Sequence, residues 1–308
     1  MFNLHINIES ISCVRATVCP FIFKLLFVRQ ATTSQKQRKK ILLMNEWANP
    51  ISQFPLAITS QTFFGMRFDT INQAETLDLL ATRDADAQFG YVVTPNVQHV
   101  VDAHRKIARK QLFEDSLLCI CDSQPVRALA YFLGNAPSLV TGADLTVALF
   151  ENVIQDGDTI STICASEELA KSLQQKYPNL DWHVHIPPAD TDVGTPAFDE
   201  CVEFLTNTPA RFSFVCIGAP KSEEICHAAF ELRSSTGTAI CTGAALEFLV
   251  GLKKRAPRIF QTLGIEWVYR IISEPGRLWR RYASAGPTLL KLFFKDLKMK
   301  WFPLKHSH

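Results

Sequence analysis

Short apolar runs alternate with longer segments of mixed polarity over most of the chain after about residue 57. The runs predict strands at 91–94, 117–121, 159–164, 182–186, 212–217 and 238–241. The spacing of apolar residues between them predicts helices at 97–111, 123–133, 143–154, 166–176, 196–206 and 222–234. Continuous apolar strands that alternate with helices are typical of a parallel sheet covered on both faces. The pattern therefore predicts a doubly wound, Rossmann-like α/β fold with a mostly parallel sheet.

Polar residues and glycines follow four of these expected strands. They are Thr94 and Asn96, then Asp122, then the segment Gly218–Glu223, and finally Gly243. In doubly wound sheets, ligands bind outside the carboxyl ends of the strands, so these positions are candidates for a binding site. Each also has a purely structural explanation: Asn96 as a helix cap, Asp122 as a turn residue and Gly243 as a packing glycine.

The charge is divided unevenly along the 308 residues, although its total is only +2. Residues 1–43 carry a net +6, residues 44–250 a net −14 and residues 251–308 a net +10. This division predicts a basic leader at 1–43, an α/β catalytic domain at 44–250 and a basic appendage at 251–308. The leader lacks the features of a secretory signal and is expected to be dispensable or not part of the native protein.

The remaining composition narrows the class of protein. Nine cysteines, several of them inside apolar runs, indicate free thiols in a reducing compartment rather than a disulfide framework. No apolar run is long enough to predict a transmembrane helix. The glycine-rich fingerprint of dinucleotide binding, the P-loop and the serine-hydrolase elbow are all missing from the sequence, and no convincing set of metal ligands is present.

The basic C-terminal segment predicts an amphipathic helix beyond Pro287. Leucine and aromatic residues recur there at four-residue spacing, and lysines lie on another face: Leu289, Phe293, Leu297 and Trp301 against Lys291, Lys295 and Lys298. A cationic helix with aromatic residues favours binding to an anionic membrane surface, here through residues 277–305. The alternative is a helix packed on its own domain. No recognised nucleic-acid motif accompanies the charge, so no nucleic-acid partner is expected.

An ordered series of motifs in the second half of the chain resembles a known family. The series consists of Gly243–Gly251, Arg255-Ala256-Pro257, Gly264–Arg270, and Glu274-Pro275 continuing to Arg281-Tyr282. Shorter matches precede it at Thr94-Pro95-Asn96, Thr141–Leu145, Pro187-Pro188 and Gly218–Lys221. In these motifs, over about residues 60 to 290, the chain resembles the WecG/TagA/CpsF glycosyltransferases of bacterial surface-polysaccharide synthesis.

The resemblance implies an inverting transfer of a hexose, of the N-acetylmannosamine type or related, from a UDP-sugar to an undecaprenyl-diphosphate-linked sugar. It implies no cofactor, no metal, and a cytoplasmic location at the inner face of the cell membrane; a homo-oligomer is possible. Asp122 is implied as the general base, with Thr94 and Asn96 in the same pocket. The residues implied for binding the donor and its diphosphate are Gly142, Asp144, Gly218, Pro220, Lys221, Glu223, Gly243, Arg270, Arg277 and Arg281.

Three positions depart from the family pattern around this pocket. The family's Pro-Asp-Gly is Cys121-Asp122-Ser123 here, its Pro-Lys-Gln-Glu has Ser222 in place of Gln, and an Arg before the Thr-Gly motif is Leu139. These departures leave the donor sugar open. They also leave two alternatives: a catalytically weak sugar-nucleotide-binding scaffold of a polysaccharide assembly complex, and a nucleotide-dependent enzyme of another class.

Overall fold

The computed structural model describes residues 58–301 except residue 135. The leader expected at 1–43 and the chain beyond Trp301 lie outside the described residues.

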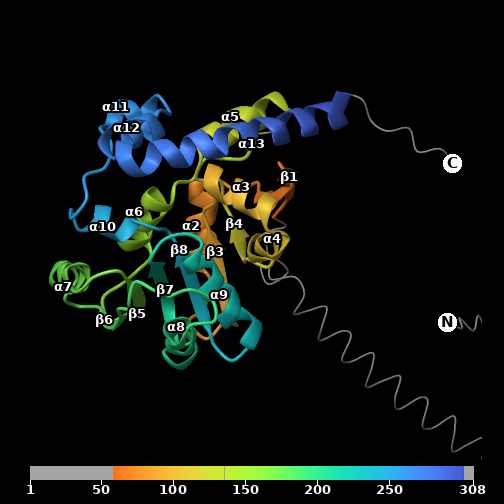
Figure 1. Cartoon of the computed structure of the whole chain (residues 1–308). Helices are drawn as coiled ribbons and strands as arrows, with labels where there is room; N and C mark the ends of the chain where they lie inside the picture. Colours follow the sequence, from red (N-terminus) through yellow and green to blue (C-terminus); the bar gives the residue numbers. More distant parts are fainter. Residues whose placement is uncertain (1–57, 135, 302–308) are drawn as a thin grey trace, which may run out of the picture. The chain divides into compact units, whose positions relative to one another are not determined.

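A six-stranded parallel sheet forms the centre of the described chain (Figure 1). Its strands are β3 (Gly90–Val93), β4 (Leu118–Cys119), β5 (Thr159–Cys164), β6 (Asp181–His185), β7 (Ala210–Cys216) and β8 (Gly237–Cys241). They lie in the order β4-β3-β8-β7-β5-β6, and every neighbouring pair is parallel. The chain leads outward from β3 to one edge and from β5 to the other. The predicted doubly wound α/β fold is therefore confirmed.

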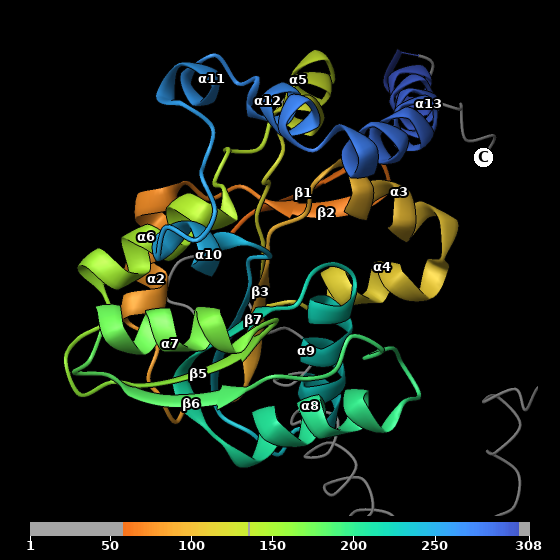
Figure 2. The same cartoon turned by 60° about the vertical axis from the view of Figure 1, so that its left-hand side comes forward.

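Helices cover both faces of the sheet (Figure 2), and a separate hydrophobic cluster lies on each face. Among the helices of the first cluster are α3 (Val97–Arg105), α4 (Ile107–Glu114), α8 (Pro196–Asn207) and α9 (Lys221–Leu232). Helices of the second are α2 (Gln73–Ala81), α6 (Gly142–Asn152), α7 (Glu167–Lys176) and α10 (Ala245–Leu249). Alternate strand residues enter opposite clusters: Tyr91 and Val93 belong to the first and Val92 to the second. Burial on both faces explains why central strands such as β3 and β7 are largely apolar, whereas the edge strand β6 is only partly buried.

The expected helix at 97–111 is in fact two helices. Lys106 has extended backbone angles, with φ −126° and ψ 102°, and it separates α3 from α4. The break lets both helices place apolar residues in the same cluster, with Val100 and Val101 from α3 and Leu112 and Phe113 from α4.

A hairpin that the sequence pattern did not predict precedes α2. Its strands are β1 (Ser60–Phe63) and β2 (Met66–Asp69), joined by Phe64 and Gly65 with positive φ angles of 57° and 75°. Two consecutive positive φ angles are characteristic of the tight turns that match strand twist. The Phe64 N–H donates a hydrogen bond of 2.6 Å to the Asp296 carboxylate, which connects the hairpin to the last helix.

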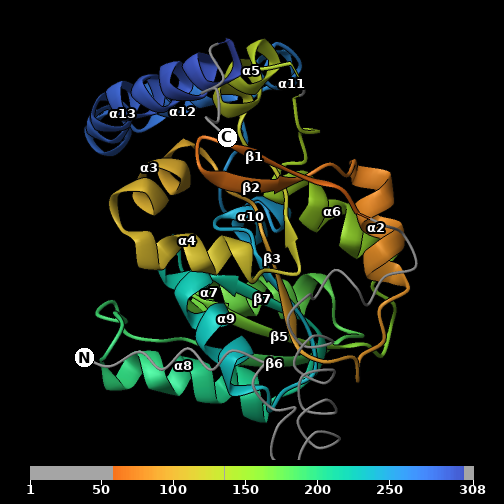
Figure 3. The ribbon, with the colours of Figure 1, turned by 90° about the vertical axis from the view of Figure 1, so that its right-hand side faces the viewer.

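Four helices gather beyond the carboxyl ends of the strands (Figures 1 and 3). They are α5 (Gln124–Phe132), α11 (Arg258–Thr262), α12 (Glu266–Ser273) and α13 (Pro275–Trp301). The amphipathic helix expected after Pro287 begins at Pro275 and continues through that proline. Within residues 58–301, no helix is both long and apolar enough to cross a membrane.

The apolar stripe of α13 packs on the protein itself. Leu278, Ala285, Leu289 and Leu292 are buried, and Phe293 packs against the first cluster. Leu289 is thus buried and Phe293 is partly buried against the core, as the alternative of a helix packed on its own domain expects for these two side chains. Five large apolar side chains of the helix remain largely exposed, and Trp301 of the expected stripe is one of them: Trp279, Leu290, Phe294, Met299 and Trp301.

Candidate active site

Asp122 lies between β4 and α5, at the carboxyl end of the sheet. Its backbone N–H donates to the Pro95 carbonyl (3.1 Å), which joins the segments after β3 and β4. The Gly142 backbone N–H donates to the Asp122 carboxylate. Ser123 caps α5, since its hydroxyl accepts from the Val126 N–H at 3.3 Å. Ser123, which stands where the family pattern has Gly, therefore caps the helix. Asp122, just before it, lines the cavities described below.

The electrostatic surroundings bring the Asp122 carboxyl into the neutral range. Burial raises its pKa to about 7, and the nearby Glu266 also raises it. Arg270, the Gly142 N–H and His99 act in the opposite direction and favour the carboxylate. A carboxyl whose pKa lies near neutrality can take up a proton and release it at the pH of the cell, which is what a general base requires.

Thr94 and Asn96 follow β3 and lie beside Asp122. The Thr94 hydroxyl donates to the Cys241 carbonyl (3.1 Å), so it joins the ends of β3 and β8. Asn96 caps α3, accepting from the Gln98 N–H at 3.0 Å, and it also accepts from the Arg281 guanidinium at 3.3 Å. Asn96 is therefore a helix cap, as its structural explanation expects, and its side chain also lies at the cavities described below.

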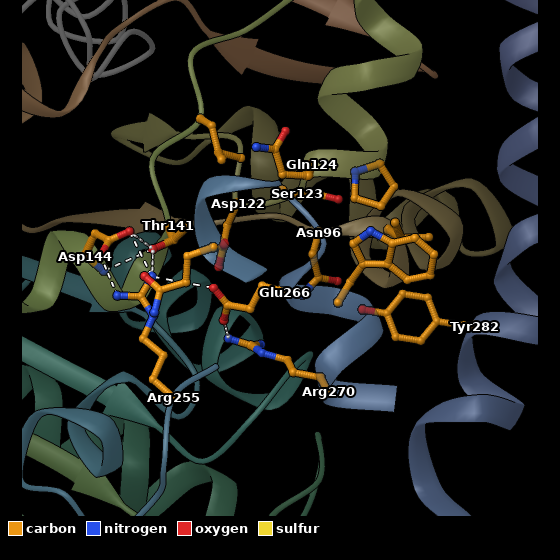
Figure 4. Close-up of a pocket in the computed structure, with 16 residues that line it drawn as sticks. Asn96, Asp122, Ser123, Gln124, Thr141, Asp144, Arg255, Glu266, Arg270 and Tyr282 are labelled. Atoms are coloured by element: carbon orange, nitrogen blue, oxygen red, sulfur yellow. Dashed lines mark hydrogen bonds and ion pairs between the residues drawn. The ribbon is translucent and has the colours of Figure 1, made fainter. Parts of the chain in front are cut away.

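Two adjoining cavities meet at these residues. The smaller, of about 140 Å³, lies among α5, α11, α12 and α13 and is lined in part by Trp267 and Tyr282 (Figure 4). The larger, of about 360 Å³, lies over the loops after β7 and β8 and is lined in part by Gly218 and Gly243. Four residues line both cavities: Asn96, Asp122, Thr141 and Arg270.

The glycines expected at the donor site differ in what a side chain would meet there. A Cβ on Gly142 would lie 3.1 Å from Thr94 Oγ1 and 3.3 Å from Thr242 Cβ, so it would displace the residues beside Asp122. Gly218 and Gly243 have positive φ angles of 94° and 56° and line the larger cavity. A bare backbone at both loops permits close approach of a ligand.

Asp144 is committed to an ion pair. Both of its carboxylate oxygens accept from the Arg255 guanidinium, one of them at 2.9 Å, and it also accepts from the Thr141 hydroxyl at 2.7 Å. The hydrogen bonds from Arg255 hold the pKa of Asp144 below its usual value. Arg255 also lies 3.7 Å from Glu266, which in turn lies 2.7 Å from Arg270 (Figure 4). Asp144 therefore positions the segment that leads to α11 and α12.

Lys221 does not line either cavity. Its ammonium donates to the Ala189 carbonyl at 3.0 Å and lies 3.2 Å from the Asp192 carboxylate. Pro220 forms a cis peptide bond with Ala219 just before α9. The side chain of Glu223, three residues after Pro220, is buried and lines the larger cavity.

The structure describes the side chains of two of the three predicted arginines, and both of these line a cavity. Arg270 lines both cavities and Arg281 lines the larger one. The side chain of Arg277 lies outside the described residues. Among the residues that the structure describes, no cluster of three or more His, Cys, Asp or Glu side chains is arranged to hold a metal ion.

Several lining residues were not among the predicted site residues. They are His99, Lys253, Arg255, Glu266, Trp267 and Tyr282. Most of them belong to the family-like motifs after residue 250, which were the available signal. His99 had no such signal, because nothing in its helical context distinguishes it from an ordinary buried histidine.

The fold and the site together define a class of protein. A parallel sheet with glycine loops and cations outside its carboxyl ends is the arrangement with which doubly wound enzymes bind nucleotides. A carboxyl with a pKa near 7 at the same place adds acid–base chemistry.

A family model described as the glycosyl transferase WecG/TagA/CpsF family matches residues 61–302. The match covers most of the chain, and the chain belongs to this family. The protein is therefore a glycosyltransferase of cell-surface polysaccharide synthesis. Members of this family use a sugar-nucleotide donor and a lipid-linked acceptor.

Proposed function

We propose that the protein transfers a hexose from a UDP-sugar to a polyprenyl-diphosphate-linked sugar, with inversion at the anomeric carbon. The observation that carries the proposal is the position of Asp122, which lines both cavities and has a pKa of about 7. A base at the junction of two cavities can reach a hydroxyl in one while the reacting carbon lies in the other.

The larger cavity fits the sugar nucleotide. Its wall includes the loops at Gly218 and Gly243, whose backbones are open to a ligand. Lys253, Arg270 and Arg281 supply positive charge along the same wall. Cations placed where charge develops stabilise a departing diphosphate. In this assignment Lys221 joins the start of α9 to the loop after β6 through Ala189 and Asp192. Arg270 and Arg281 then take the diphosphate-binding role that was first expected of Lys221.

The smaller cavity fits the sugar end of the acceptor. Trp267 and Tyr282 stand 5.9 Å apart between ring centroids, and aromatic rings of this kind pack against sugar faces. Glu266 and Arg270 add polar groups that can bind hydroxyls. The lipid would leave this cavity toward the end of the molecule formed by α5, α11 and α12.

The reaction then follows as a single displacement. Asp122 removes the proton from the acceptor hydroxyl, and the hydroxyl oxygen forms a bond to the anomeric carbon. The bond from that carbon to the UDP oxygen breaks at the same time, and UDP leaves as an anion beside Arg270 and Arg281. Attack opposite the leaving group inverts the configuration, and the proton remains on Asp122 until solvent removes it.

A donor screen tests the proposed function. We expect the full chain to release UDP from at least one UDP-hexose when a short-chain polyprenyl-diphosphate-linked sugar is present. Release should require both substrates, because Asp122 needs the acceptor hydroxyl as its partner. UDP-sugar binding without turnover across a broad acceptor panel would contradict the proposal and favour the scaffold alternative.

We also propose that the exposed side of the C-terminal helices lies on an anionic membrane surface. Trp279, Phe294 and Trp301 on α13 are 59%, 61% and 70% exposed. Other large exposed side chains lie on the neighbouring helices: Tyr131 and Phe132 on α5, Ile259 on α11 and Ile272 on α12. Exposed lysines on α13 accompany the aromatic residues: Lys291, Lys295 and Lys298. Apolar side chains combined with cations match the interface of an anionic bilayer.

Vesicle flotation tests the membrane proposal. Replacing Lys291, Lys295 and Lys298 by Gln should weaken partitioning of the full chain onto vesicles with anionic lipid by roughly a hundredfold, at about 1 kcal/mol per lysine. Lys171→Gln, an exposed lysine on α7, is the matched control and should leave partitioning unchanged. Equal flotation of the triple variant and the wild-type protein would contradict the proposal.

A further inference from the structure

A buried histidine and a buried glutamate face each other in the wall of the larger cavity. His99 comes from the first turn of α3 and Glu223 from the first turn of α9. They are only 7% and 5% exposed, and both line the cavity. Their nearest atoms, His99 Nε2 and Glu223 Oε1, are 3.3 Å apart but lack the alignment of a hydrogen bond.

The hydrogen bond on the other side of the ring determines where the His99 proton lies. The Asn96 backbone N–H donates to His99 Nδ1 at 3.0 Å, so Nδ1 must be unprotonated. A neutral imidazole with Nδ1 as acceptor carries its proton on Nε2. The ring also packs edge-on against Phe113, with ring centroids 5.8 Å apart, which holds its orientation.

The pair consequently presents one unused donor and one unused acceptor. Among the described residues, neither His99 Nε2 nor Glu223 Oε2 has a hydrogen-bond partner. A buried polar atom without a partner costs about 1–3 kcal/mol, which makes it a good place for a ligand group to bind. A hydroxyl suits both atoms at once, because it can donate to the carboxylate oxygen and accept from the imidazole N–H.

This chemistry does not suit a diphosphate. The Glu223 carboxylate would repel phosphate oxygens, whereas it attracts hydroxyl donors. His99 lines the same cavity as Asp122, and its ring accepts from the backbone of Asn96, which also lines that cavity. In a displacement assisted by Asp122, the sugar ring that is transferred must lie next to that carboxylate.

We infer that Glu223 and His99 together bind a hydroxyl of the transferred hexose, and that this pair selects the donor sugar. The inference rests on the proposed function and changes the role of Glu223 from diphosphate binding to recognition of the sugar. The Gln that the family has at position 222 is Ser222 here, a short buried residue beside Glu223. Recognition of the sugar on this wall therefore falls to the Glu223–His99 pair.

Calorimetric titration of UDP and of a UDP-hexose panel into the full chain tests this inference. We expect Glu223→Gln to leave the Kd for UDP within about twofold of the wild-type value. The same variant should weaken binding of the preferred UDP-hexose by about tenfold or more, because a hydrogen bond to a charged group is lost. Glu224→Gln is the matched control: Glu224 pairs with Arg109 at 3.1 Å, lines neither cavity, and should bind both ligands like the wild-type protein.

Deoxy analogues of the preferred donor provide a second measurement on unmodified protein. One analogue that lacks a single hydroxyl should bind the wild-type protein about tenfold more weakly and show little further loss with Glu223→Gln. Equal losses of UDP and UDP-hexose binding in Glu223→Gln would overturn the inference, as would unchanged binding of both. A wild-type protein that does not bind UDP at all would instead refute the proposed function itself.

Discussion

Replacing Asp122 by Asn should lower kcat by about 10²- to 10⁴-fold, the usual contribution of a positioned general base. Asn has nearly the same shape, so it can still accept the Gly142 N–H and leave the loop after β4 in place. It cannot take a proton from the acceptor hydroxyl. The measurement is UDP release at saturating donor and acceptor, with thermal unfolding and UDP binding to show that the variant is folded.

The control for this variant is an aspartate outside both cavities. Asp86→Asn lies on an exposed turn before β3 and should keep wild-type turnover. The affinity of Asp122→Asn for UDP should be unchanged or slightly higher, because a negative charge has been removed from the cavity wall. Turnover of Asp122→Asn within about threefold of the wild-type protein would remove Asp122 from the mechanism.

The second large effect is the dependence of kcat/KM on pH. Asp122 acts as a base only when ionised, and its pKa is about 7. Activity should therefore fall about tenfold for each pH unit below 7 and reach roughly a hundredth of its plateau near pH 5. A profile that stays flat between pH 5 and 8 would show that the group responsible has an ordinary carboxyl pKa.

Substitutions of two residues near Asp122 should shift the acidic limb of this profile, where kcat/KM falls below pH 7, in opposite directions. Arg270 favours the Asp122 carboxylate, so Arg270→Gln should raise the pKa and shift the limb to higher pH. Glu266 disfavours the carboxylate, so Glu266→Gln should lower the pKa and shift the limb to lower pH. Glu168→Gln, an exposed glutamate on α7, is the control and should not move it. Shifts of the same sign in both variants would contradict this electrostatic account.

Much of the fold could be predicted because its strands are buried on both faces. The strand expected at 159–164 is found at Thr159–Cys164, since an uncharged run rich in isoleucine and threonine is distinctive of a buried strand. The break at Lys106 and the passage of α13 through Pro287 could not be predicted in the same way. Both depend on which neighbouring elements the helices pack against, and local spacing carries no record of that packing.

The candidate site, like the fold, could be predicted only in part. Thr94, Asn96 and Asp122 could be located because a parallel topology brings the residues that follow its strands to one edge. Arg255 and Asp144 are 111 residues apart, and only the folded chain shows that they pair. The direction of Lys221 toward Ala189 was likewise decided by a neighbouring loop. Sequence thus predicted which backbone positions meet, and tertiary contacts decided which side chains face the cavities.

The ionisable residues around the smaller cavity have a consequence for how an acceptor enters it. Three acids and two bases line it: Asp122, Asp144 and Glu266 against Arg255 and Arg270. When all are charged, their sum is negative, and the two arginines are already engaged by Asp144 and Glu266. A diphosphate is repelled from such a chamber, whereas an uncharged sugar is not. Under the proposed function, we expect this chamber to admit the sugar end of a lipid-linked acceptor first and to exclude the phosphates of that acceptor.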